Sequence, residues 1–573
     1  MSTPVNPITV EIIRNALIAV ADEMNATLIR SAYTPIVYEM KDCSVALLDS
    51  EHRVLGQSAG LPIFLGNLEA CTIAIEEQYG RNVWAPGDVW IMNDPYVTGT
   101  HLHDMTVMEP IFDDSQLLGF AASRAHWLDV GSKDPGGTID STDVFQEGLR
   151  LAPIKVVEAG TQVATITQMI GRNSRFYHGA VGDLGAQIAC CHTGARRLPE
   201  IFRRFGAATV LAARDEIFAQ AERLEREFIA SVPDGVYRAE GTIDSDGISD
   251  REVAVRVEVS IDGDRMAIDL SDSDDACQGP VNCGATQAVA AARVAYKLLV
   301  DPHRPANGGS FRPLTVEVRD GSLVGANEPS PVEWYFTPLG LLIDLVVKAL
   351  SEAVPERAAA ASYGDSMVIY LSGTHPDTRQ PWLHVEPTVG GWGAWQGSDG
   401  EDGLINNVNG SLKDMPIEVL ETKYPVRLRH YGYRSDSCGH GEFRGGVGVE
   451  REFEILADAS MSAWFERSRT PAWGLAGGGT AQPPDIVINP GRPDERHLLK
   501  CANVRLSQGD VVRTKTGGGG GFGRPDDRDR DAVRTDVFDG VITPETARRV
   551  YGLSVARRSS GPRDDSPRKA GAT

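Results

Sequence analysis

The chain has 573 residues, of which 42% are hydrophobic and 24% are charged, and its formal net charge is −23. A chain of this length and composition buries a large core without covalent staples, which excludes a disordered protein, a fibre and a disulfide-held miniprotein. The acidic balance repels phosphate backbones and anionic lipid, and no Lys/Arg cluster with interleaved aromatics offsets it, so we expect neither nucleic acid nor a membrane as a partner.

The first 232 residues are predicted to form a mixed α/β region that carries a metal site. Apolar residues recur near the 3.6-residue period over 10–32, which predicts a helix with Thr9 as its candidate N-cap. Shorter apolar runs predict strands, and stretches rich in Ala, Leu, Arg and Glu predict further helices. The expected strands cover 43–48, 88–92 and 117–127, and the expected helices cover 67–79 and 181–229.

The pattern changes near Pro233, where a middle α/β region begins that we assign to 233–380. Short strands separated by Asp-Gly turns are predicted over 236–270. Helices are expected again at 286–299 and at 339–353.

Glycines dominate the next region, which we assign to 381–529 and expect to be β-rich, with tight turns and close backbone approach. The glycine run at 516–523 has no following lysine or helical pattern, so it is interpreted as a turn and not as a phosphate loop. C-terminal helices are expected at 530–556 and a disordered tail at 557–573. The fold class is therefore α+β, with a helical or mixed N-terminal half and a β-rich, Gly-rich C-terminal half.

The eight cysteines are scattered, and none forms a C-x-x-C pair, which argues against a thiolate zinc site. The adjacent Cys190 and Cys191 are interpreted as small residues on a predicted helix. The best apolar run, 339–350, contains Asp344 and Lys348 and is too short to span a bilayer, and the N-terminus lacks a secretory pattern. Reduced thiols and these two observations make a cytoplasmic location the expectation.

Histidine is scarce, with 12 in the chain, yet His101, His103 and His126 fall within 26 residues. Together with Asp104, and with Asp42 just before a predicted strand, they offer the nitrogen and oxygen ligands that Zn, Mn or Fe take in proteins. For any single histidine, a structural role is the simpler alternative. The cluster, however, follows turn signals, and loops of that kind carry ligands more often than packed elements do.

Two local geometries are open for the pair of neighbouring histidines. Strand alternation would place His101 and His103 on one face, so that both could reach a metal. A turn would instead bring His101 and Asp104 together, three residues apart. Gly99 and the Asp94-Pro95 pair favour an irregular loop, and hence the second arrangement.

Nine ordered stretches then make the chain recognisable: it resembles the hydantoinase B/oxoprolinase family, which also includes subunits of acetone and acetophenone carboxylases. The likeness covers roughly residues 6–555. The matching stretches are N-D-P-Y-x-x-G-T-H-L-x-D at 93–104, A-H-x-x-D-V-G at 125–131, G-D-L-x-A-Q-I-A at 182–189, G-A-R-R-L at 194–198, G-P-V-N at 279–282, P-I-E-V-L-E at 416–421, Y-P-V-R at 424–427, F-R-G-G-x-G at 443–448 and G-G-G-G-x-G at 518–523.

The resemblance implies a subunit that works beside a larger ATPase partner of the hydantoinase A type. That partner phosphorylates the carbonyl oxygen of a lactam or hydantoin, and the B-type subunit hydrolyses the activated ring at a metal. ATP is then used by the partner and is not bound here, in keeping with the lack of a phosphate loop in this sequence. Carried over by residue, the ligands of the divalent ion would be Asp42, His101, Asp104 and His126.

These residue types suit that chemistry, because phosphorylation makes the carbonyl oxygen a good leaving group and a metal lowers the pKa of bound water toward about 7. The candidate catalytic side chains are His126, Asp129 and His103. Asp129 either orients His126 or caps a backbone segment. His103, with an ordinary pKa near ~6.5, is a candidate proton shuttle to the departing ring nitrogen.

The sequence also departs from the family pattern. The usual E-T-S-Q-R stretch reads V-E-W-Y-F-T at 332–337, and only its glutamate is kept. Glu333, Trp334 and Tyr335 are the candidate substrate-binding residues, and the aromatics favour a bulky or aromatic substrate unless they are plain core. Asp414 and Cys191 stand where the family usually has asparagine.

Three functions follow from the sequence. The first is the metal-dependent catalytic subunit of an ATP-dependent amidohydrolase that opens a hydantoin, lactam or 5-oxoproline-like ring. The alternative is a subunit of an ATP-dependent ketone carboxylase of the acetone or acetophenone type. A non-catalytic scaffold for the ATPase subunit is the third.

Overall fold

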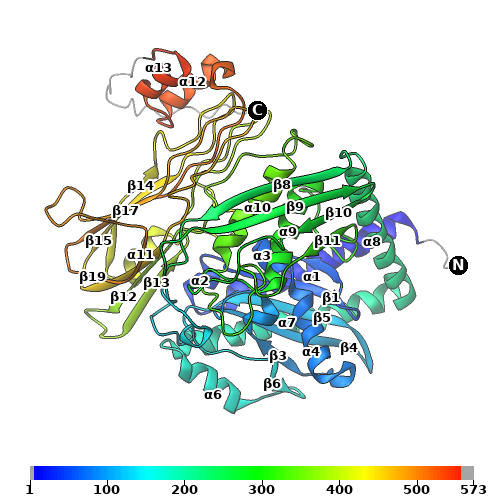
Figure 1. Ribbon diagram of the computed structural model, residues 1–573. Helices are drawn as coiled ribbons and strands as arrows, with labels where there is room; N and C mark the ends of the chain where they lie inside the picture. Colours follow the sequence, from blue (N-terminus) through cyan, green and yellow to red (C-terminus); the bar gives the residue numbers. More distant parts are fainter. Residues whose placement is uncertain (1–4, 556–573) are drawn as a thin grey trace, which may run out of the picture.

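The computed structural model describes residues 5–555, so the tail predicted at 557–573 lies outside the described range. Helices and mostly antiparallel sheets make up the molecule, which confirms the predicted α+β class. The described residues form four sheets: the first two follow one another along the chain, and the strands of the last two interleave in sequence (Figure 1). One continuous cluster of buried side chains extends from Val10 to Val512 and joins the three main regions. No helix within the described range is long and apolar enough to cross a membrane.

A seven-stranded sheet, in the order β2-β1-β5-β4-β3-β6-β7, organises the first region. Alternate strand residues face opposite sides, so Val45 and Leu47 pack into the core under α1 and α7, whereas Leu48 packs with α4. Both faces are therefore covered by helices. The helices are α1 Pro7–Ser31, α2 Pro35–Tyr38, α3 Pro62–Leu65, α4 Leu68–Tyr79, α5 Pro95–Thr98, α6 Ala164–Asn173, α7 Tyr177–Phe205 and α8 Ala207–Ile229, and the strands are β1 Cys43–Asp49, β2 Val54–Gln57, β3 Val89–Met92, β4 Asp104–Asp113, β5 Gln116–His126, β6 Ile154–Glu158 and β7 Thr161–Gln162.

Two local predictions in this region need correction. The N-cap of α1 is Asn6, whose side chain accepts the Ile8 N–H at 2.9 Å. Pro7, at the first helical position, starts the helix two residues before Thr9. The long strand β4 was not predicted, because its residues 104–113 are mixed in polarity although most are buried.

The middle region pairs a four-stranded sheet with two helices. Its sheet has the order β11-β10-β9-β8, and along β9 buried valines alternate with more exposed residues, the signature of a sheet with one covered face. Helix α10 packs on that face beside α9. The elements are β8 Gly235–Ile243, β9 Val253–Asp262, β10 Arg265–Asp269, α9 Ala285–Val300, β11 Leu314–Glu317 and α10 Phe336–Ala349.

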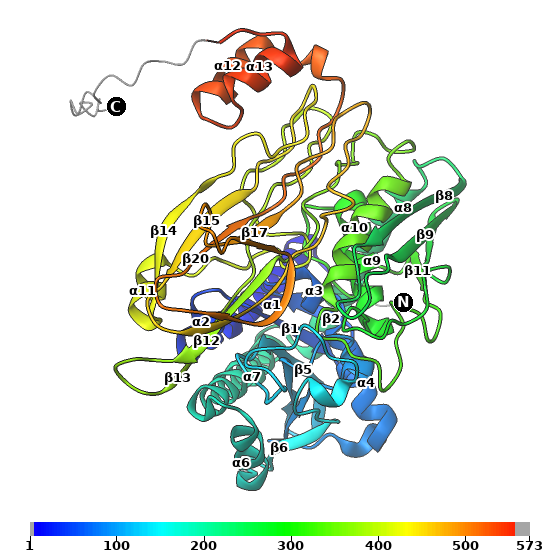
Figure 2. The same ribbon diagram turned by 60° about the vertical axis from the view of Figure 1, so that its left-hand side comes forward.

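The C-terminal region holds two further sheets, β13-β12-β16-β19 and β14-β15-β20-β17-β18. The boundary predicted between residues 380 and 381 falls inside the β12–β13 hairpin. The last two helices pack on the Gly-rich region through a small separate core (Figure 2). The elements are β12 Val368–Thr374, β13 Pro381–Glu386, α11 Ile417–Lys423, β14 Val426–Tyr433, β15 Val449–Ile455, β16 Ala459–Trp464, β17 Asp485–Ile488, β18 Arg496–Leu498, β19 Lys500–Leu506, β20 Val511–Lys515, α12 Arg530–Phe538 and α13 Pro544–Tyr551.

The glycine run at 516–523 is not the turn that we predicted. It is an extended, buried segment whose backbone bonds to several other segments: the Gly519 N–H donates to Gly446 at 2.9 Å, and the Gly519 carbonyl accepts from Gly439 at 2.8 Å. A Cβ atom on Gly519 would lie 1.9 Å from the Trp392 carbonyl oxygen. Main chain therefore packs directly on main chain, which only glycine permits.

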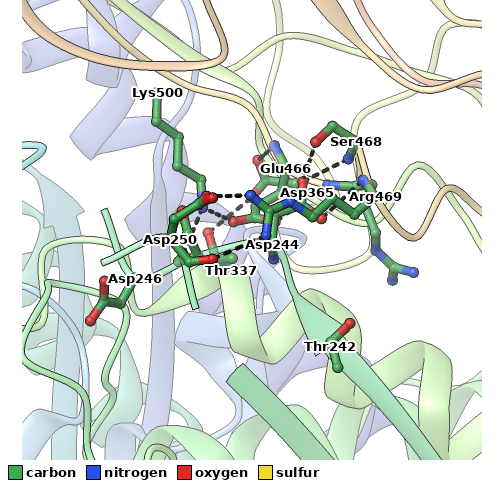
Figure 3. Close-up of polar contacts among 12 residues, drawn as sticks. Thr242, Asp244, Asp246, Asp250, Thr337, Asp365, Glu466, Ser468, Arg469 and Lys500 are labelled. Atoms are coloured by element: carbon green, nitrogen blue, oxygen red, sulfur yellow. Dashed lines mark hydrogen bonds and ion pairs between the residues drawn. The ribbon is translucent and has the colours of Figure 1, made fainter. Parts of the chain in front are cut away.

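A buried polar cluster ties the middle sheet to the C-terminal region (Figure 3). The Lys500 ammonium pairs with Glu466, donates to the Ser245 carbonyl at 2.7 Å and lies 3.9 Å from the ring centre of Trp464. Glu466 in turn accepts the Asp244 N–H at 3.0 Å. These contacts join the end of β8 to β16 and β19 and so hold two regions in a fixed relation.

Candidate metal centre

Three neighbouring strands end at one edge of the N-terminal sheet, and each places a polar side chain there. Asp42 immediately precedes β1, Asp104 begins β4 and His126 ends β5. In the β4–β5 ladder Asp104 lies directly opposite His126, and the His126 N–H donates to the Asp42 carbonyl at 3.0 Å. The sheet register itself therefore gathers these three residues.

His101 reaches the same place from the loop between α5 and β4. Gly99 adopts a left-handed φ of 78°, and a Cβ atom there would lie 2.5 Å from the Gln287 nitrogen, so the turn requires glycine. The turn places His101 Nε2 3.2 Å from Asp104 Oδ1 and 3.1 Å from His126 Nδ1. Of the two geometries left open by the sequence, the structure shows the one that joins His101 and Asp104.

The donor atoms of His101, Asp104 and His126 lie close enough together to hold one divalent cation. Asp104 Oδ1 is also 3.3 Å from His126 Nδ1, and ligands about 2.1 Å from one ion lie roughly 3.0–3.4 Å from one another. All three, together with Asp42, line a small cavity of about 30 Å³, the volume of one ion or water. Asp42 Oδ1 and Asp104 Oδ1 are buried without a hydrogen-bond partner. Such orphaned atoms are costly unless a ligand satisfies them.

The electrostatics of the protein alone pair His101 with Asp104. Burial lowers the pKa of His101, but Asp104 and Glu333 together outweigh burial and raise this pKa to about 9. Burial raises the pKa of Asp104, and the two histidines reverse this and hold it well below its usual range. Burial keeps the pKa of His126 at about 4, and burial followed by the Asp104 charge raises the pKa of Asp42. A neutral His126 has a lone pair free for coordination.

His103 lies beside this set and faces Glu333. Its ring stacks on His126 with centres 5.2 Å apart, and His103 Nδ1 is 3.5 Å from Glu333 Oε1. Both ring nitrogens and both carboxylate oxygens are buried without a hydrogen-bond partner. Burial, then the His101 charge, lowers the pKa of His103 to about 3, and burial raises the pKa of Glu333 to about 8. His101, His103 and Glu333 form a second group whose donor atoms converge.

The segment predicted to bind substrate covers the site from the middle region, but its members face different ways. The Glu333 carbonyl accepts a hydrogen bond from His101 Nδ1 at 3.0 Å, and the Tyr335 hydroxyl donates to Asp104 Oδ2 at 3.0 Å. Tyr335 and Phe336 line the cavity. Trp334 points away and stacks on Trp464 with centres 4.9 Å apart, as the plain-core interpretation predicts for it.

Glu147, which sequence reasoning missed, holds this segment in place. Its buried carboxylate accepts the backbone N–H groups of Val332 at 2.9 Å and Glu333 at 3.0 Å, and the Ser141 hydroxyl at 2.7 Å. Burial and then the nearby Glu333 raise the pKa of Glu147 to about 8. No spacing in the sequence connects residue 147 with residue 333, so only the tertiary structure reveals the contact.

Asp129 bonds to the turn before α7. Its Oδ1 accepts the Arg175 guanidinium and its Oδ2 accepts the Arg175 N–H, both at 2.7 Å, and Ser174 donates to Oδ2 at 3.3 Å. The hydrogen bonds found within residues 5–555 include none from Asp129 to His126. Of the two roles left open for Asp129, the contacts match the bonding of a backbone segment.

Several residues of the matched stretches support the site without lining it. Gln187 on α7 accepts the Trp127 indole N–H and donates to the Met105 carbonyl, both at 2.9 Å, and thereby fixes β4 and β5. Asn93 donates to the Leu102 carbonyl at 2.6 Å. Asn282 donates to the Pro331 carbonyl at 2.9 Å and so holds the segment that leads to Glu333.

The other two departures from the family pattern, Asp414 and Cys191, lie outside the cavity lining. Asp414 pairs with Arg451, which also binds Glu386 at 3.0 Å in a buried network. Cys191 Sγ lies 3.5 Å from the Val107 carbonyl oxygen, where α7 packs on β4.

The chain is thus a mixed sheet-and-helix protein with a candidate divalent-cation centre. Two imidazoles and two carboxylates, from strand ends and one loop, line its small cavity. Comparison with known protein families identifies the family to which the chain belongs. The family model Hydantoinase B/oxoprolinase matches residues 6–525, and the chain belongs to this family.

Three similar proteins illustrate the relationship. The chain is 31% identical to the B-type subunit of a putative D-/L-hydantoinase from Pseudomonas sp. (strain NS671), over 96% of this chain and 95% of that one. It superposes on the crystal structure of ATP-dependent caprolactamase from Pseudomonas jessenii with a TM-score of 0.90 and 28% identity, over 97% of each chain. Nucleotide-free acetone carboxylase shares the fold with a TM-score of 0.86 at 20% identity, over 97% of this chain and 80% of that one.

Proposed function

We propose that this chain is the metal-dependent catalytic subunit of an ATP-dependent amidohydrolase, and that it opens a hydantoin, lactam or 5-oxoproline-like ring. The observation that carries the proposal is the small cavity lined by Asp42, His101, Asp104 and His126, where donor atoms of the last three converge and one oxygen of each carboxylate has no hydrogen-bond partner. The names of relatives support the substrate class, since they include a hydantoinase subunit, a caprolactamase subunit and 5-oxoprolinases.

In the proposed mechanism these four residues hold a Zn, Mn or Fe ion. When bound, a divalent ion supplies Lewis acidity and lowers the pKa of coordinated water to about 7. Tyr335 fixes Asp104 through its hydroxyl, and the Glu333 carbonyl fixes His101 in the tautomer that exposes Nε2. These bonds orient two ligands before the ion arrives.

His103 and Glu333 are the groups proposed to handle protons. They face each other beside the cavity, they are fully buried, and none of their polar side-chain atoms has a hydrogen-bond partner. A ring-opening reaction requires a proton at the departing nitrogen. Burial leaves Glu333 protonated and His103 neutral near neutral pH, so we assign Glu333 as the proton source and His103 as the relay to the departing nitrogen.

The proposal also includes an ATPase partner of the hydantoinase A type. An amide carbonyl is a poor electrophile, and phosphorylation of its oxygen supplies the missing leaving group. The sequence has no phosphate loop, and matched relatives are named as subunits of larger enzymes. Activation is therefore assigned to the partner and ring opening to this chain.

The test is to purify the chain with its co-expressed partner and to screen lactams, hydantoins, 5-oxoproline and ketones for substrate-dependent ATP hydrolysis. We expect a cyclic amide to be opened, and the same complex carrying His126→Ala to lose ring opening. Labelled bicarbonate separates the alternative: fixation of label on a ketone, with no amide opened, would identify a ketone carboxylase instead. Full turnover without the partner would contradict the assignment of activation.

A further inference from the structure

A pocket of about 820 Å³ lies where the three main regions meet, and it is much larger than the metal cavity. Its walls come from the β1–β2 turn, from α4, from α9 with the loop that follows it, and from Trp392 and Leu404 of the Gly-rich region. Pockets of roughly 300–1,000 Å³ at such junctions are where proteins usually bind small molecules.

The pocket and the metal cavity share a thin wall. Leu61 and Phe64 line the metal cavity, whereas Pro62 of the same short segment lines the large pocket. A second segment does the same, with Asn409 on the cavity side and Gly410 on the pocket side. The two segments touch, since a Cβ atom on Gly410 would lie 2.4 Å from Pro62. One layer of chain therefore separates the spaces.

The wall matters because the metal cavity is too small to hold an organic substrate, whereas the pocket on its other side is large enough. A space of about 30 Å³ holds one ion or water, whereas a cavity that takes a six-membered ring is on the order of 150 Å³. An organic ring therefore does not fit inside this cavity as the lining stands. Movement of the Leu61 and Asn409 segments would join the cavity to a space that is already large enough.

The lining of the pocket is apolar with a cationic rim. Pro62, Leu65 and Leu298 offer an apolar wall, and five Lys or Arg side chains face the space, against two glutamates. Four of the five cations already pair with acidic residues: Arg53 with Asp49, Arg293 with Glu69, Lys297 with Asp301 and Arg312 with Glu222. Arg304 is exposed and, within residues 5–555, makes no hydrogen bond, ion pair or ring contact. It is the cation that remains free for a ligand.

We propose that this pocket binds an amphipathic organic anion, with the apolar body against Pro62, Leu65 and Leu298 and the charged group at Arg304. This inference rests on the proposed function, under which the anion is the O-phosphorylated cyclic amide on its way to the metal cavity. A phosphoryl group on an apolar ring matches both the free guanidinium and the apolar wall.

The experiment uses the accessibility of an introduced thiol in the full-length protein. All eight native cysteines are buried, so Leu298→Cys, at a position 37% exposed in the pocket, is the thiol that maleimide reaches. Leu211→Cys on α8, at a position 36% exposed and outside the pocket lining, is the matched control. The probes are phenyl phosphate, inorganic phosphate and neutral caprolactam, and the readout is the alkylation rate.

We expect phenyl phosphate to slow alkylation of Leu298→Cys about tenfold, with a much weaker effect of either other probe and no effect at Leu211→Cys. Adding Arg304→Gln should abolish this protection. Equal protection with and without Arg304→Gln, or no protection by phenyl phosphate, would overturn the proposal.

Turnover separates this proposal from the proposed function. In the complex with its ATPase partner, alkylated Leu298→Cys should lose most ring opening while it retains its metal, and alkylated Leu211→Cys should lose none. Protection of the thiol by phenyl phosphate without any amide turnover would support anion binding in the pocket and refute the amidohydrolase function. Amide turnover that survives alkylation at residue 298 would support the amidohydrolase function and refute the role proposed for the pocket.

Discussion

The N-terminal sheet and the Gly-rich region build rigid interiors in opposite ways. In the sheet, side chains fill both faces, and the strand ends are left to present Asp42, Asp104 and His126 at one edge. Around Gly519 the main chain packs against main chain, with no space for a side chain. The contrast explains why donor atoms gather in the first region, whereas the second supplies shape and walls.

The largest effect on stability is expected when a single methyl group is added to the closely packed glycine segment. Gly519→Ala would place Cβ 1.9 Å from the Trp392 carbonyl oxygen, which no rotamer change can relieve. We expect a loss of more than about 4 kcal/mol in the free energy of unfolding, or insoluble protein. Gly517→Ala is the matched control, because its nearest contact would be an ordinary 3.4 Å from Tyr363. Thermal melts compare the two, and equal melting temperatures would refute the close-packing account.

A second prediction concerns the cluster that joins the middle sheet to the C-terminal region. Burial raises the pKa of Glu466 to about 7 from an ordinary 4.5. The folded state then binds more protons than the unfolded state between these values, so this residue's contribution to stability is greatest below pH 4.5 and declines as pH rises to about 7.

Glu466→Gln should remove that decline. The melting temperature of the wild type relative to the variant should therefore fall as pH rises through this window and level off above it. Glu452→Gln, at a partly exposed position on β15, is the control. A constant difference across the window would show that Glu466 does not titrate there.

The smallest effects are expected at Trp334 and Tyr335, which are adjacent in the chain but contact different parts of the structure. Tyr335→Phe removes one hydrogen bond to Asp104, so we expect metal affinity to fall about tenfold with little change in melting temperature. Trp334→Phe disturbs the stack on Trp464, so melting temperature should fall while metal affinity stays unchanged. Metal titration and thermal melts on both variants decide the matter, and the reverse pattern would contradict the assigned orientations.

Local hydrophobic periodicity and turn residues were enough to predict many of the individual helices and strands. The strand predicted at 43–48 and the helix predicted at 67–79 were found within one residue, as β1 and α4, because their apolar patterns are strong. The pairing of β1 with β5 and of β5 with β4 has no such local signal. The Gly-rich run was misread because its partners, such as Trp392, are more than a hundred residues away.

The residues of the candidate site likewise fall into those that the sequence could predict and those that it could not. His101, Asp104 and His126 were identifiable because scarce histidines and a carboxylate cluster near turn signals. Glu147 was not, since its role depends on backbone N–H groups of residues 332 and 333. Nor could sequence show that Trp334 and Tyr335, adjacent in the chain, face opposite ways.

The central claim is the metal centre, and elemental analysis of purified variants tests it most directly. Wild type and single alanine variants of His101, His103, Asp104 and His126 would be prepared from the same metal-supplemented cultures, with circular dichroism as the check on folding. We predict about one divalent ion per chain in the wild type and in His103→Ala, and loss of the ion in His101→Ala, Asp104→Ala and His126→Ala. Loss of metal in folded His103→Ala, together with its retention in His101→Ala, would contradict the account.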